Sequence, residues 1–354
     1  MAERIALAMI GCGFFAQNHL NAWQDLKRET IGALAGALPE GVDIVAVCDV
    51  DPERARAAAE KFGVPRWYTD AAVMFRAEQL GLVDIATQMQ SHLPLVKLAL
   101  SHQVPTIIQK PFGQDLGEVR EMVAAARAAG TFLAVHENFR FQKPLRRIAE
   151  IVRSGAIGAP TWARVSFRTG YDIYAGQPYL AEQQRFVLID LGVHVLDVAR
   201  VLLGEVEHST AELQRRNPMA RGEDTATMLL RHTSGAVSVV ECTYGSRRLP
   251  DSFPETLIEV EGDKGAIVSR IGNQVEVTIN GKLEVLDEDP AVLPWAARPW
   301  HVAQESVLAT NRHMLEAVRA GRPAATSAED NLKTFALVEA AYLAAGKVKP
   351  PTAG

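Results

Sequence analysis

The sequence predicts an α/β fold with two domains, and three observations support this. In residues 1–137, short apolar runs alternate with longer segments of helical periodicity, as in a parallel sheet with helices on both faces. In residues 138–354, the strand-like segments alternate polar and apolar side chains, which is typical of a mostly antiparallel sheet with one covered face. The length of 354 residues is also that of two domains of ordinary size.

The elements of the first domain are expected to alternate, and those of the second to form an α+β arrangement. The first-domain strands are expected at 5–10, 44–48, 83–87, 106–109 and 132–136, and the helices at 16–26, 52–62, 93–102 and 116–129. In the second domain we expect helices at 144–154, 189–203, 303–320 and 328–344, and strands at 161–169, 225–231, 236–244, 256–261, 266–270 and 274–280. Residues 29–41 and 287–299 are expected to be loops.

The composition excludes several classes of protein. Hydrophobic residues make up 48% and charged residues 22%, and 37 basic against 42 acidic side chains give a net charge of -5, so neither nucleic acid nor a membrane surface is expected as a partner. The uncharged run at 5–18 lacks the positive flank of a signal peptide, and other apolar stretches are far shorter than a membrane span. The cysteines Cys12, Cys48 and Cys242 have no metal-binding or disulfide spacing, which fits a soluble protein of the reducing cytoplasm.

A glycine-rich segment directly after the first expected strand has the G-x-G-x-x-A pattern of a dinucleotide phosphate loop. Gly11 allows the tight turn, Gly13 leaves room for a pyrophosphate, and Ala16 lets the helix pack closely on the strand. The backbone N–H groups around Phe14 and Phe15 then face the anion. The alternative, a tight strand-to-helix turn without a ligand, is disfavoured by the alternating elements around it.

The second expected strand ends in Asp49, which is placed to accept hydrogen bonds from an adenosine ribose. Asp49 lies 38 residues after Gly11 where about 20 is usual, so residues 29–41 are interpreted as an insertion. A carboxylate at this position repels the 2′-phosphate of NADP, and Asp51 adds to the repulsion. NAD is therefore the expected cofactor and NADP is disfavoured, although Arg54 is a cation that could reach a 2′-phosphate.

Two further groups of polar residues carry candidate chemistry. Lys110 ends the fifth strand, at the carboxyl edge where ligands of parallel sheets bind, and it can stabilise negative charge on a substrate oxygen. In the expected helix 189–203, the spacing of Asp190, His194 and Asp197 places three polar side chains on one face. Such a set could bind a metal, but no H-E-x-x-H motif or cysteine ligand accompanies it, so no metal is expected. Asp190 could equally cap the helix, and Asp197 is interpreted as structural.

Taken together, these motifs make the chain similar to the glucose-fructose oxidoreductase, inositol dehydrogenase and rhizopine catabolism (Gfo/Idh/MocA) family over essentially its full length. The matching segments are Gly11 to Ala16 with His19, Cys48-Asp49, 84–87 with His92, 109–112, 136–141, Gly155 with Gly158, 190–197 and 326–332. The resemblance implies a Rossmann domain that binds NAD and a second domain with a large open sheet. It also implies a homo-oligomer, a dimer or tetramer, because that sheet often mediates assembly.

The resemblance also implies roles for individual residues. Lys110, Asp190 and His194 are the expected catalytic residues, with His194 as the base, because imidazole titrates near pH 6.5. The expected cofactor-binding residues are Gly11, Gly13, Phe14, Phe15, Asp49, Thr87, His92, Gln109 and Lys110. The expected substrate-binding residues are Lys110, Asn138, Arg140, Arg168, Gln177, Asp190 and His194.

The implied activity is oxidation of a sugar hydroxyl by hydride transfer to NAD. Within the family, the segments 86–89, 135–141 and 239–244 resemble members that oxidise a branched pentose at its anomeric carbon to the lactone. The alternatives are an inositol, polyol or other aldose dehydrogenase, a glycoside hydrolase that uses bound NAD, and a non-catalytic NAD-responsive protein. Two departures from the family pattern stand out: Gln109 replaces the usual Glu, and residues 185–189 replace a glycine-rich lead into Asp190.

Overall fold

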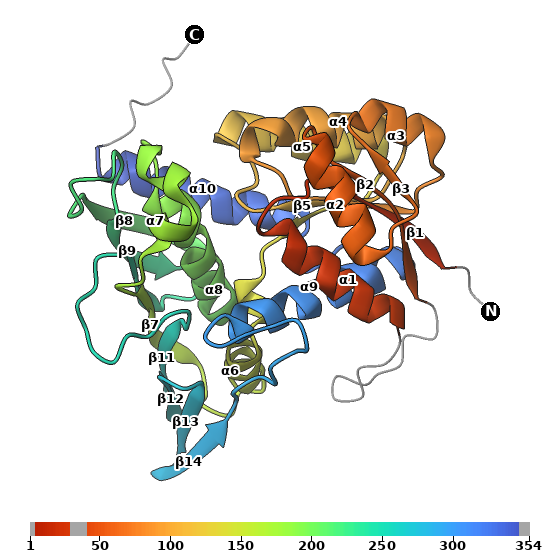
Figure 1. Cartoon of the computed structure of the whole chain (residues 1–354). Coiled ribbons are helices and arrows are strands. Elements are labelled where there is room, and N and C mark those ends of the chain that lie inside the picture. Colours follow the sequence, from red (N-terminus) through yellow and green to blue (C-terminus); the bar gives the residue numbers. More distant parts are fainter. Residues whose placement is uncertain (1–3, 29–40, 347–354) are drawn as a thin grey trace. The chain divides into compact units, whose positions relative to one another are not determined.

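The computed structural model describes residues 4–28 and 41–346, and the chain divides into two compact units (Figure 1). Unit 1 consists of Met1–Glu137 and Val307–Lys333, and unit 2 of Asn138–Ser306 and Thr334–Gly354. The sequence also places a boundary after residue 137. Residues 307–333, which the sequence assigns to the second domain, group instead with unit 1. The expected insertion at 29–41 lies almost entirely outside the described residues.

In its described part, unit 1 contains a six-stranded sheet with the order β3-β2-β1-β4-β5-β6, in which neighbouring strands pair in parallel. This is the strand order of dinucleotide-binding Rossmann domains, in which the ligand binds where the order reverses, beside β1 and β4. The last three strands are buried along their whole length, as sheets covered on both faces require. The strands are β1 (Ile5–Ile10), β2 (Val42–Cys48), β3 (Arg66–Tyr68), β4 (Leu82–Ile85), β5 (Thr106–Gln109) and β6 (Leu133–His136).

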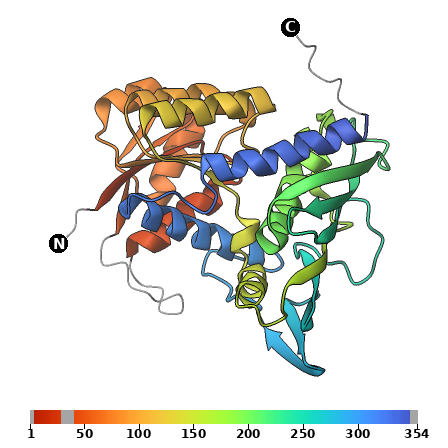
Figure 2. The same cartoon turned by 180° about the vertical axis from the view of Figure 1, so that it is seen from behind.

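The helices of unit 1 have local stop and start signals. For example, α2 has Asp51 as its N-cap, Pro52 in its first turn and Gly63 in the left-handed conformation at its end. In both views α4 and α5 lie side by side (Figures 1 and 2). The elements are α1 (Ala16–Arg28), α2 (Pro52–Phe62), α3 (Ala71–Ala77), η1 (Met89–Ser91), α4 (His92–Ser101) and α5 (Leu116–Ala129).

Residues 326 and 327 extend the unit 1 sheet beyond β6, which explains why 307–333 group with this unit. The N–H of Val135 donates to the carbonyl of Thr326 at 2.9 Å, and the Thr326 hydroxyl donates to the Val135 carbonyl at 2.7 Å. Ala134 and Ser327 form an antiparallel bridge. A late segment of the chain thus completes the edge of the first sheet.

Unit 2, as far as it is described, contains an eight-stranded sheet with the order β14-β13-β12-β11-β7-β10-β9-β8. Strands β7 and β10 pair in parallel, and the other neighbours pair antiparallel, so the prediction of a mostly antiparallel sheet is confirmed. Burial alternates along β9, as expected for a sheet with one covered face. The strands are β7 (Pro160–Arg168), β8 (Val206–Gln214), β9 (Thr225–His232), β10 (Val237–Thr243), β11 (Leu257–Gly262), β12 (Gly265–Arg270), β13 (Gln274–Ile279) and β14 (Lys282–Asp287).

Helix α8 packs against β7 and β10 and supplies the centre of the unit 2 core. The helical elements that begin in unit 2 are η2 (Phe139–Phe141), α6 (Lys143–Arg153), α7 (Ile173–Gly176), η3 (Pro178–Glu182), η4 (Leu188–Gly192), α8 (Val193–Leu203) and α9 (His301–Arg319). Helix α10 (Ala328–Ala344) begins in unit 1 and continues into unit 2. Within the described ranges, no helix is both long enough and apolar enough to cross a bilayer.

Three strands that the sequence did not predict, β3, β8 and β14, lie at the edges of their sheets. Edge strands bury little side-chain area, so their residues lack the apolar pattern that marks inner strands. In β14, five of the six residues are exposed. The short helix α3 was also not predicted.

Candidate active site

The glycine-rich segment connects β1 to α1 at the carboxyl edge of the parallel sheet. Gly11 has a φ of +95°, and a Cβ on it would lie 2.3 Å from the carbonyl oxygen of Ala86, so only glycine fits. At Gly13, by contrast, none of the described atoms lies within 4 Å of the Cβ position, which leaves open space above the loop. The first turn of α1, which is fully described, contains no acidic residue. The loop therefore fits the pyrophosphate of a dinucleotide.

Asp49 fixes this loop through two backbone hydrogen bonds. Its Oδ2 accepts from the N–H of Cys12 at 2.7 Å, and its Oδ1 accepts from the N–H of Asp51 at 2.9 Å. The residue is 8% exposed. A carboxylate accepts about four hydrogen bonds, so Asp49 can hold the loop and still accept from a ribose.

Arg54, the cation that could favour NADP, forms an ion pair with a neighbouring carboxylate. Arg54 lies beside Asp51, with a distance of 3.4 Å between Nε and Oδ2. Asp51 also accepts from the N–H groups of Glu53 and Arg54, as the N-cap of α2. These contacts favour NAD, because Arg54 already has a carboxylate partner.

His92 joins the two loops that follow β4 and β5. Its ring is fully buried, with Nε2 3.2 Å from the carbonyl oxygen of Thr87 and Nδ1 3.3 Å from that of Phe112. Burial lowers the pKa of His92, which keeps the ring neutral. Both nitrogens face backbone atoms, so an effect of His92 on a cofactor is expected to act through these loops.

Lys110 follows β5 at the same edge, and the peptide between Lys110 and Pro111 is cis. The N–H of Lys110 donates to Oε1 of Gln109 at 2.6 Å. The amide nitrogen of Gln109 lies 3.1 Å from Nε2 of His19, and the other ring nitrogen of His19 lies 2.8 Å from Oδ2 of Asp84. The sequence motifs contain these residues, but their spacing along the chain gives no sign that they form one network.

The sequence predicts that Asp190 of unit 2 lies on a regular α-helix, but the structure shows a different geometry there. Residues Leu188–Gly192 form a π-helical turn, and the α-helix begins only at Val193. The expectation of one regular α-helix over residues 189–203 is therefore wrong at its start, because Asp190 lies in the π-helical turn. Such turns are frequent at functional sites.

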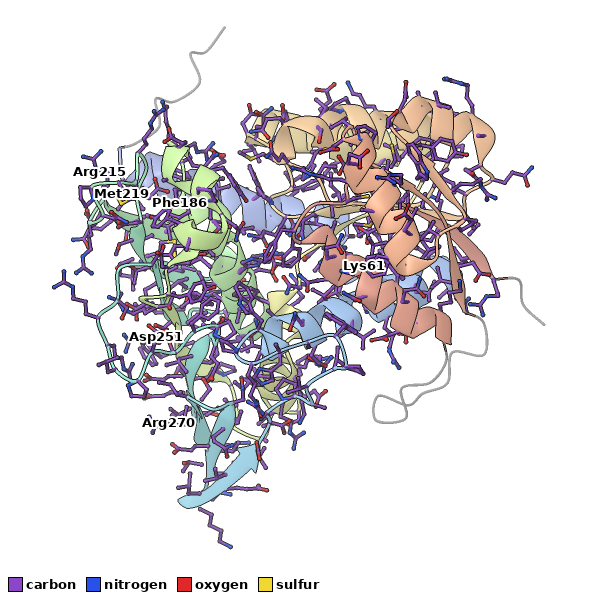
Figure 3. All side chains as sticks on the ribbon, viewed as in Figure 1. Lys61, Phe186, Arg215, Met219, Asp251 and Arg270 are labelled. Carbon is purple, nitrogen blue, oxygen red and sulfur yellow. The ribbon has the colours of Figure 1, made fainter. Side chains whose placement is uncertain are left out.

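The carboxylate of Asp190 is held by Tyr244, at the end of β10. The Tyr244 hydroxyl donates to Oδ2 of Asp190 at 2.7 Å. Burial and the neighbouring Asp190 raise the pKa of Tyr244 well above its usual value, so the phenol keeps its proton. The Tyr244 ring stacks on Phe186, with 5.6 Å between ring centroids (Phe186 is labelled in Figure 3). Sequence analysis did not identify Tyr244 as a site residue.

The π turn is anchored at its start by a buried carboxylate. Oε1 of Glu223 accepts from the N–H of Phe186 at 3.0 Å and from that of Leu188 at 3.4 Å, and it also accepts from the Tyr342 hydroxyl. Glu223 is only 6% exposed. These bonds satisfy N–H groups that a helix start would leave without partners.

His194 lies in the first turn of α8 and is 2% exposed. Its ring stacks on Phe139, with 3.7 Å between centroids and 2° between planes. The aromatic face restrains the orientation of the imidazole, as a base requires. No sequence pattern predicted this contact.

The remaining predicted substrate residues all have side-chain partners. Arg140 binds the carboxylate of Asp197 with Nε and Nη2, and the Thr334 hydroxyl donates to the same carboxylate at 2.9 Å. The interpretation of Asp197 as structural fits this arrangement. The other pairs are Asn138 with Ser306 at 2.7 Å, Arg168 with Glu241 at 2.9 Å, and Gln177 with Tyr179 at 2.9 Å.

Unit 1 therefore brings together the glycine loop, Asp49 and the Lys110 network, and unit 2 brings together Asp190, His194 and their supports. Over residues 4–28 and 41–346, no group of three or more His, Cys, Asp or Glu side chains is arranged to hold a metal. The three cysteines are buried and unpaired, and burial raises the pKa of Cys12 to about 12.

Comparison with known proteins identifies the family. Residues 5–137 match the oxidoreductase family with an NAD-binding Rossmann fold, and residues 145–268 match the GFO/IDH/MocA C-terminal domain. The chain belongs to the GFO/IDH/MocA oxidoreductase family. It is an NAD-dependent enzyme, as the resemblance implied.

Two relatives named D-apiose dehydrogenase are each 47% identical to the chain. The protein of Rhizobium rhizogenes aligns over 335 residues, 95% of this chain and 93% of its own, and that of Paraburkholderia graminis over 343 residues, 97% and 88%. An oxidoreductase from Agrobacterium radiobacter, solved in complex with NAD+, L-tartaric acid and magnesium, has a TM-score of 0.92 at 46% identity and covers 97% of this chain and 96% of its own. A levoglucosan dehydrogenase in complex with NADH has a TM-score of 0.84 at 20% identity over 98% of each chain, which shows the shared fold.

Proposed function

We propose that this enzyme oxidises D-apiose at its anomeric carbon to D-apionolactone, with NAD as the hydride acceptor. The observation that carries the proposal is the 47% identity, over nearly the whole chain, to two proteins named D-apiose dehydrogenase. Proteins named inositol 2-dehydrogenase are also similar, but at 28% identity over 68% of the chain. An inositol, polyol or other aldose dehydrogenase is therefore the second candidate.

The proposed chemistry removes a hydride from the anomeric carbon and a proton from its hydroxyl group. NAD, when bound, accepts the hydride. His194 takes the proton, and Lys110 donates a hydrogen bond to the same oxygen and stabilises its developing negative charge. Asp190 orients the sugar and favours the protonated form of His194.

The contacts within each unit support these roles. Tyr244 donates to one oxygen of Asp190, which restrains the carboxylate while its second oxygen can accept from a sugar hydroxyl. The stack on Phe139 restrains the ring of His194. A catalytic group that is fixed before the substrate binds loses less entropy in the transition state.

Asn138, Arg140, Arg168 and Gln177 remain proposed substrate residues. A guanidinium carries five N–H donors, so Arg168 can bind Glu241 and still donate to a sugar hydroxyl. Arg140 is proposed to act mainly by fixing Asp197, because its fork is bidentate on that carboxylate.

The test is the formation of NADH, followed by absorbance, with D-apiose, other free aldoses, inositols, polyols and glycosides at matched concentrations. We expect D-apiose to give the highest kcat/KM, with the lactone as the product in mass spectrometry. A higher kcat/KM for an inositol would replace the proposed substrate. Cleavage of a glycoside without net NADH would instead indicate a hydrolase that stores hydride on NAD.

A metal is not part of the proposed reaction, because Asp190 and His194 act as orienting group and base. We therefore expect turnover of D-apiose to be unchanged by EDTA. Loss of turnover in EDTA that Zn²⁺, Mn²⁺ or Mg²⁺ restores would overturn this assignment.

The proposed assembly is a homodimer or homotetramer in the cytoplasm. The open sheet of unit 2 presents exposed apolar side chains, namely Leu229 on β9 and Leu283 and Val285 on the edge strand β14. Apolar surface of this kind is typical of contacts between copies of a chain. Light scattering coupled to size exclusion tests the assembly, and a monomer at micromolar concentration would contradict it. The buried, unpaired cysteines suit a reducing compartment.

A further inference from the structure

The side chain of Gln109 has only one possible orientation. The N–H of Lys110 can only donate, so the atom of Gln109 that lies 2.6 Å from it must be the amide oxygen. The amide nitrogen then points at Nε2 of His19, at 3.1 Å. Gln109 is 6% exposed, so water does not readily replace either partner.

This orientation fixes the proton on His19. The amide nitrogen of Gln109 donates, so Nε2 of His19 must accept, and the ring proton lies on Nδ1. Nδ1 then donates to Oδ2 of Asp84 at 2.8 Å, and the same oxygen accepts from Nε1 of Trp23 at 2.7 Å. His19 and Asp84 are completely buried.

The remaining neighbours of His19 add no charge. His136 stacks on His19 with 4.1 Å between ring centroids, and burial lowers the pKa of His136 to about 3, so it is neutral. Phe15 packs edge-on against His19. Asn311 accepts from Nε2 of His136 and donates to the backbone carbonyl of His19. Asp84 is the negatively charged group of this cluster.

We propose that Gln109 is a positioning residue, which fixes the backbone of Lys110 through a chain of hydrogen bonds that runs by way of His19 to the buried carboxylate of Asp84. The proposal rests on the proposed function, in which Lys110 acts on the substrate oxygen. Rotation of the peptide at Lys110 would break its bond to Gln109 and leave a buried amide oxygen without a partner. All residues of this hydrogen-bond chain belong to unit 1.

A glutamate at position 109 would face the same two partners, the N–H of Lys110 and Nε2 of His19, but it lacks the N–H donors of the glutamine amide. When this glutamate is ionised, its second oxygen cannot donate, so it can bind Nε2 of His19 only if His19 carries a second proton. With Gln109, the set Asp84, His19 and residue 109 has a net charge of -1. With Gln109→Glu and a doubly protonated His19 the net charge is again -1. The Glu variant should therefore keep Lys110 in place at low pH and release it when His19 loses the second proton.

The first measurement is the ¹⁵N spectrum of the histidine rings in the full-length protein with NAD bound, with His19 assigned by comparison with a His19→Asn variant. In the wild type we expect His19 to carry a proton on Nδ1 and none on Nε2. In Gln109→Glu we expect protons on both nitrogens at pH 6, with loss of one as the pH rises. A wild-type His19 protonated on both nitrogens, or on Nε2 alone, would overturn the proposal.

The second measurement is turnover against pH for Gln109→Glu, Gln109→Met and a matched control, Gln24→Glu. Gln24 is also a buried glutamine of unit 1, but its amide donates to the carbonyl of Phe62. We expect Gln109→Met to lower kcat by about tenfold or more at every pH, since it leaves buried polar groups unpaired. We expect the ratio of kcat in Gln109→Glu to that in the wild type to fall as the pH rises. Gln24→Glu should lower only the thermal midpoint.

The outcomes separate this proposal from the proposed function. A Gln109→Met variant that loses NAD affinity but keeps kcat would assign Gln109 to cofactor binding and overturn the positioning role. A pH-independent ratio for Gln109→Glu would also overturn it. If Lys110→Met keeps its turnover, the proposed function fails at that residue, whereas the ¹⁵N result for His19 is unaffected.

Discussion

Asp49 in unit 1 and the pair Asp190 and Asp197 in unit 2 have their carboxylates held in different ways. In unit 1, Asp49 accepts from backbone N–H groups that lie close to it in the loops after β1 and β2. In unit 2, Asp190 and Asp197 are held by side chains from elements distant in the sequence: Tyr244 follows β10, and Arg140 lies in η2. The first arrangement depends on backbone geometry that a glycine motif specifies. The second depends on particular side chains in the folded unit.

This difference determines what a substitution can change. Backbone donors remain when neighbouring side chains are replaced, so cofactor binding should tolerate most substitutions outside the glycine loop and Asp49. A side-chain donor is lost with one substitution, so the proposed chemistry of unit 2 should be sensitive at several positions. The predictions test this contrast.

The largest effect is expected for Lys110→Met and His194→Ala. A general base contributes about 10² to 10⁴ in rate and an electrostatic donor about 10² to 10³, so each variant should lose at least about a hundredfold in kcat. NAD affinity, measured by quenching of protein fluorescence, should stay close to the wild-type value because the glycine loop and Asp49 are unchanged. Because both residues are proposed to act on one oxygen, the double variant should lose less than the product of the single losses.

A kcat above about a tenth of the wild-type value in either single variant would contradict this assignment, because it lies outside the range for such groups. A parallel loss of NAD affinity would also contradict it. That result would mean that the cofactor site depends on the same side chains, and the contrast between the units would disappear.

The next effect concerns Tyr244, which the sequence did not single out. Tyr244→Phe keeps the ring and its stack on Phe186 but removes the hydrogen bond to Asp190. Hydrogen bonds to charged groups contribute about 1.5 to 3 kcal/mol, so kcat/KM for the sugar should fall by about ten- to a hundredfold. Steady-state kinetics at saturating NAD measure the loss.

The matched control is Tyr68→Phe. Tyr68 lies on β3, an edge strand of unit 1, and its hydroxyl donates to the carboxylate of Glu78. The variant should leave kcat/KM near the wild-type value. Equal losses in the two variants would mean that the effect of Tyr244 comes from general destabilisation and not from Asp190.

The same contrast explains how much the sequence could predict. The parallel sheet, the glycine loop and the position of Lys110 follow from local patterns, since buried strands are apolar and the loops at their carboxyl ends carry the ligand groups. The π turn at Leu188–Gly192 left no such signal. Its sequence is as apolar as that of a regular helix, and its geometry depends on Glu223 and Tyr244, which come from later segments.

The edge strands and the hydrogen bonds between distant side chains were missed for related reasons. An edge strand such as β8 is largely exposed and mostly polar, so its sequence resembles that of a loop. The sequence motifs contain His19, Asp84 and Gln109, but only the fold brings His19 of α1 against Gln109 of β5. The sequence shows that Gln109 replaces the usual Glu of the family. The contact between Gln109 and His19 is needed to explain what the replacement does.

A smaller effect is expected at Asp49. Asp49→Asn removes the negative charge that is proposed to face the 2′ position of the cofactor, and it weakens the hydrogen bond from the N–H of Cys12. We expect NAD affinity to fall by about tenfold and the preference for NAD over NADP to narrow by a similar factor, as loss of a charged hydrogen-bond partner predicts. Fluorescence titration with both cofactors measures this. The control Asp70→Asn, an N-cap of α3 with two backbone bonds, should leave both affinities unchanged.

The last prediction concerns buried histidines in the two units and the pH dependence of stability. Burial lowers the pKa of His136 in unit 1 to about 3, and it also lowers the pKa of His232 in unit 2. Because the pKa is lower in the folded state, an unfolded histidine binds a proton below about pH 6.5 and the folded one does not. The stabilisation is therefore complete above that pH and is lost as the pH falls towards 3.

His136 should lower the free energy of unfolding by about 1.4 kcal/mol for each pH unit that the pH falls within this window. Urea unfolding at pH 6.5, 5.5 and 4.5 measures the slope. His136→Gln should reduce the slope by nearly the full amount, and His232→Gln by less, because the hydrogen bond of His232 to the Gly204 carbonyl raises its pKa and opposes the effect of burial. If His136→Gln leaves the slope unchanged, the histidine is already protonated in the folded protein. The assignment of a neutral His136 beside His19, which is part of the argument for the position of Lys110, would then be wrong as well.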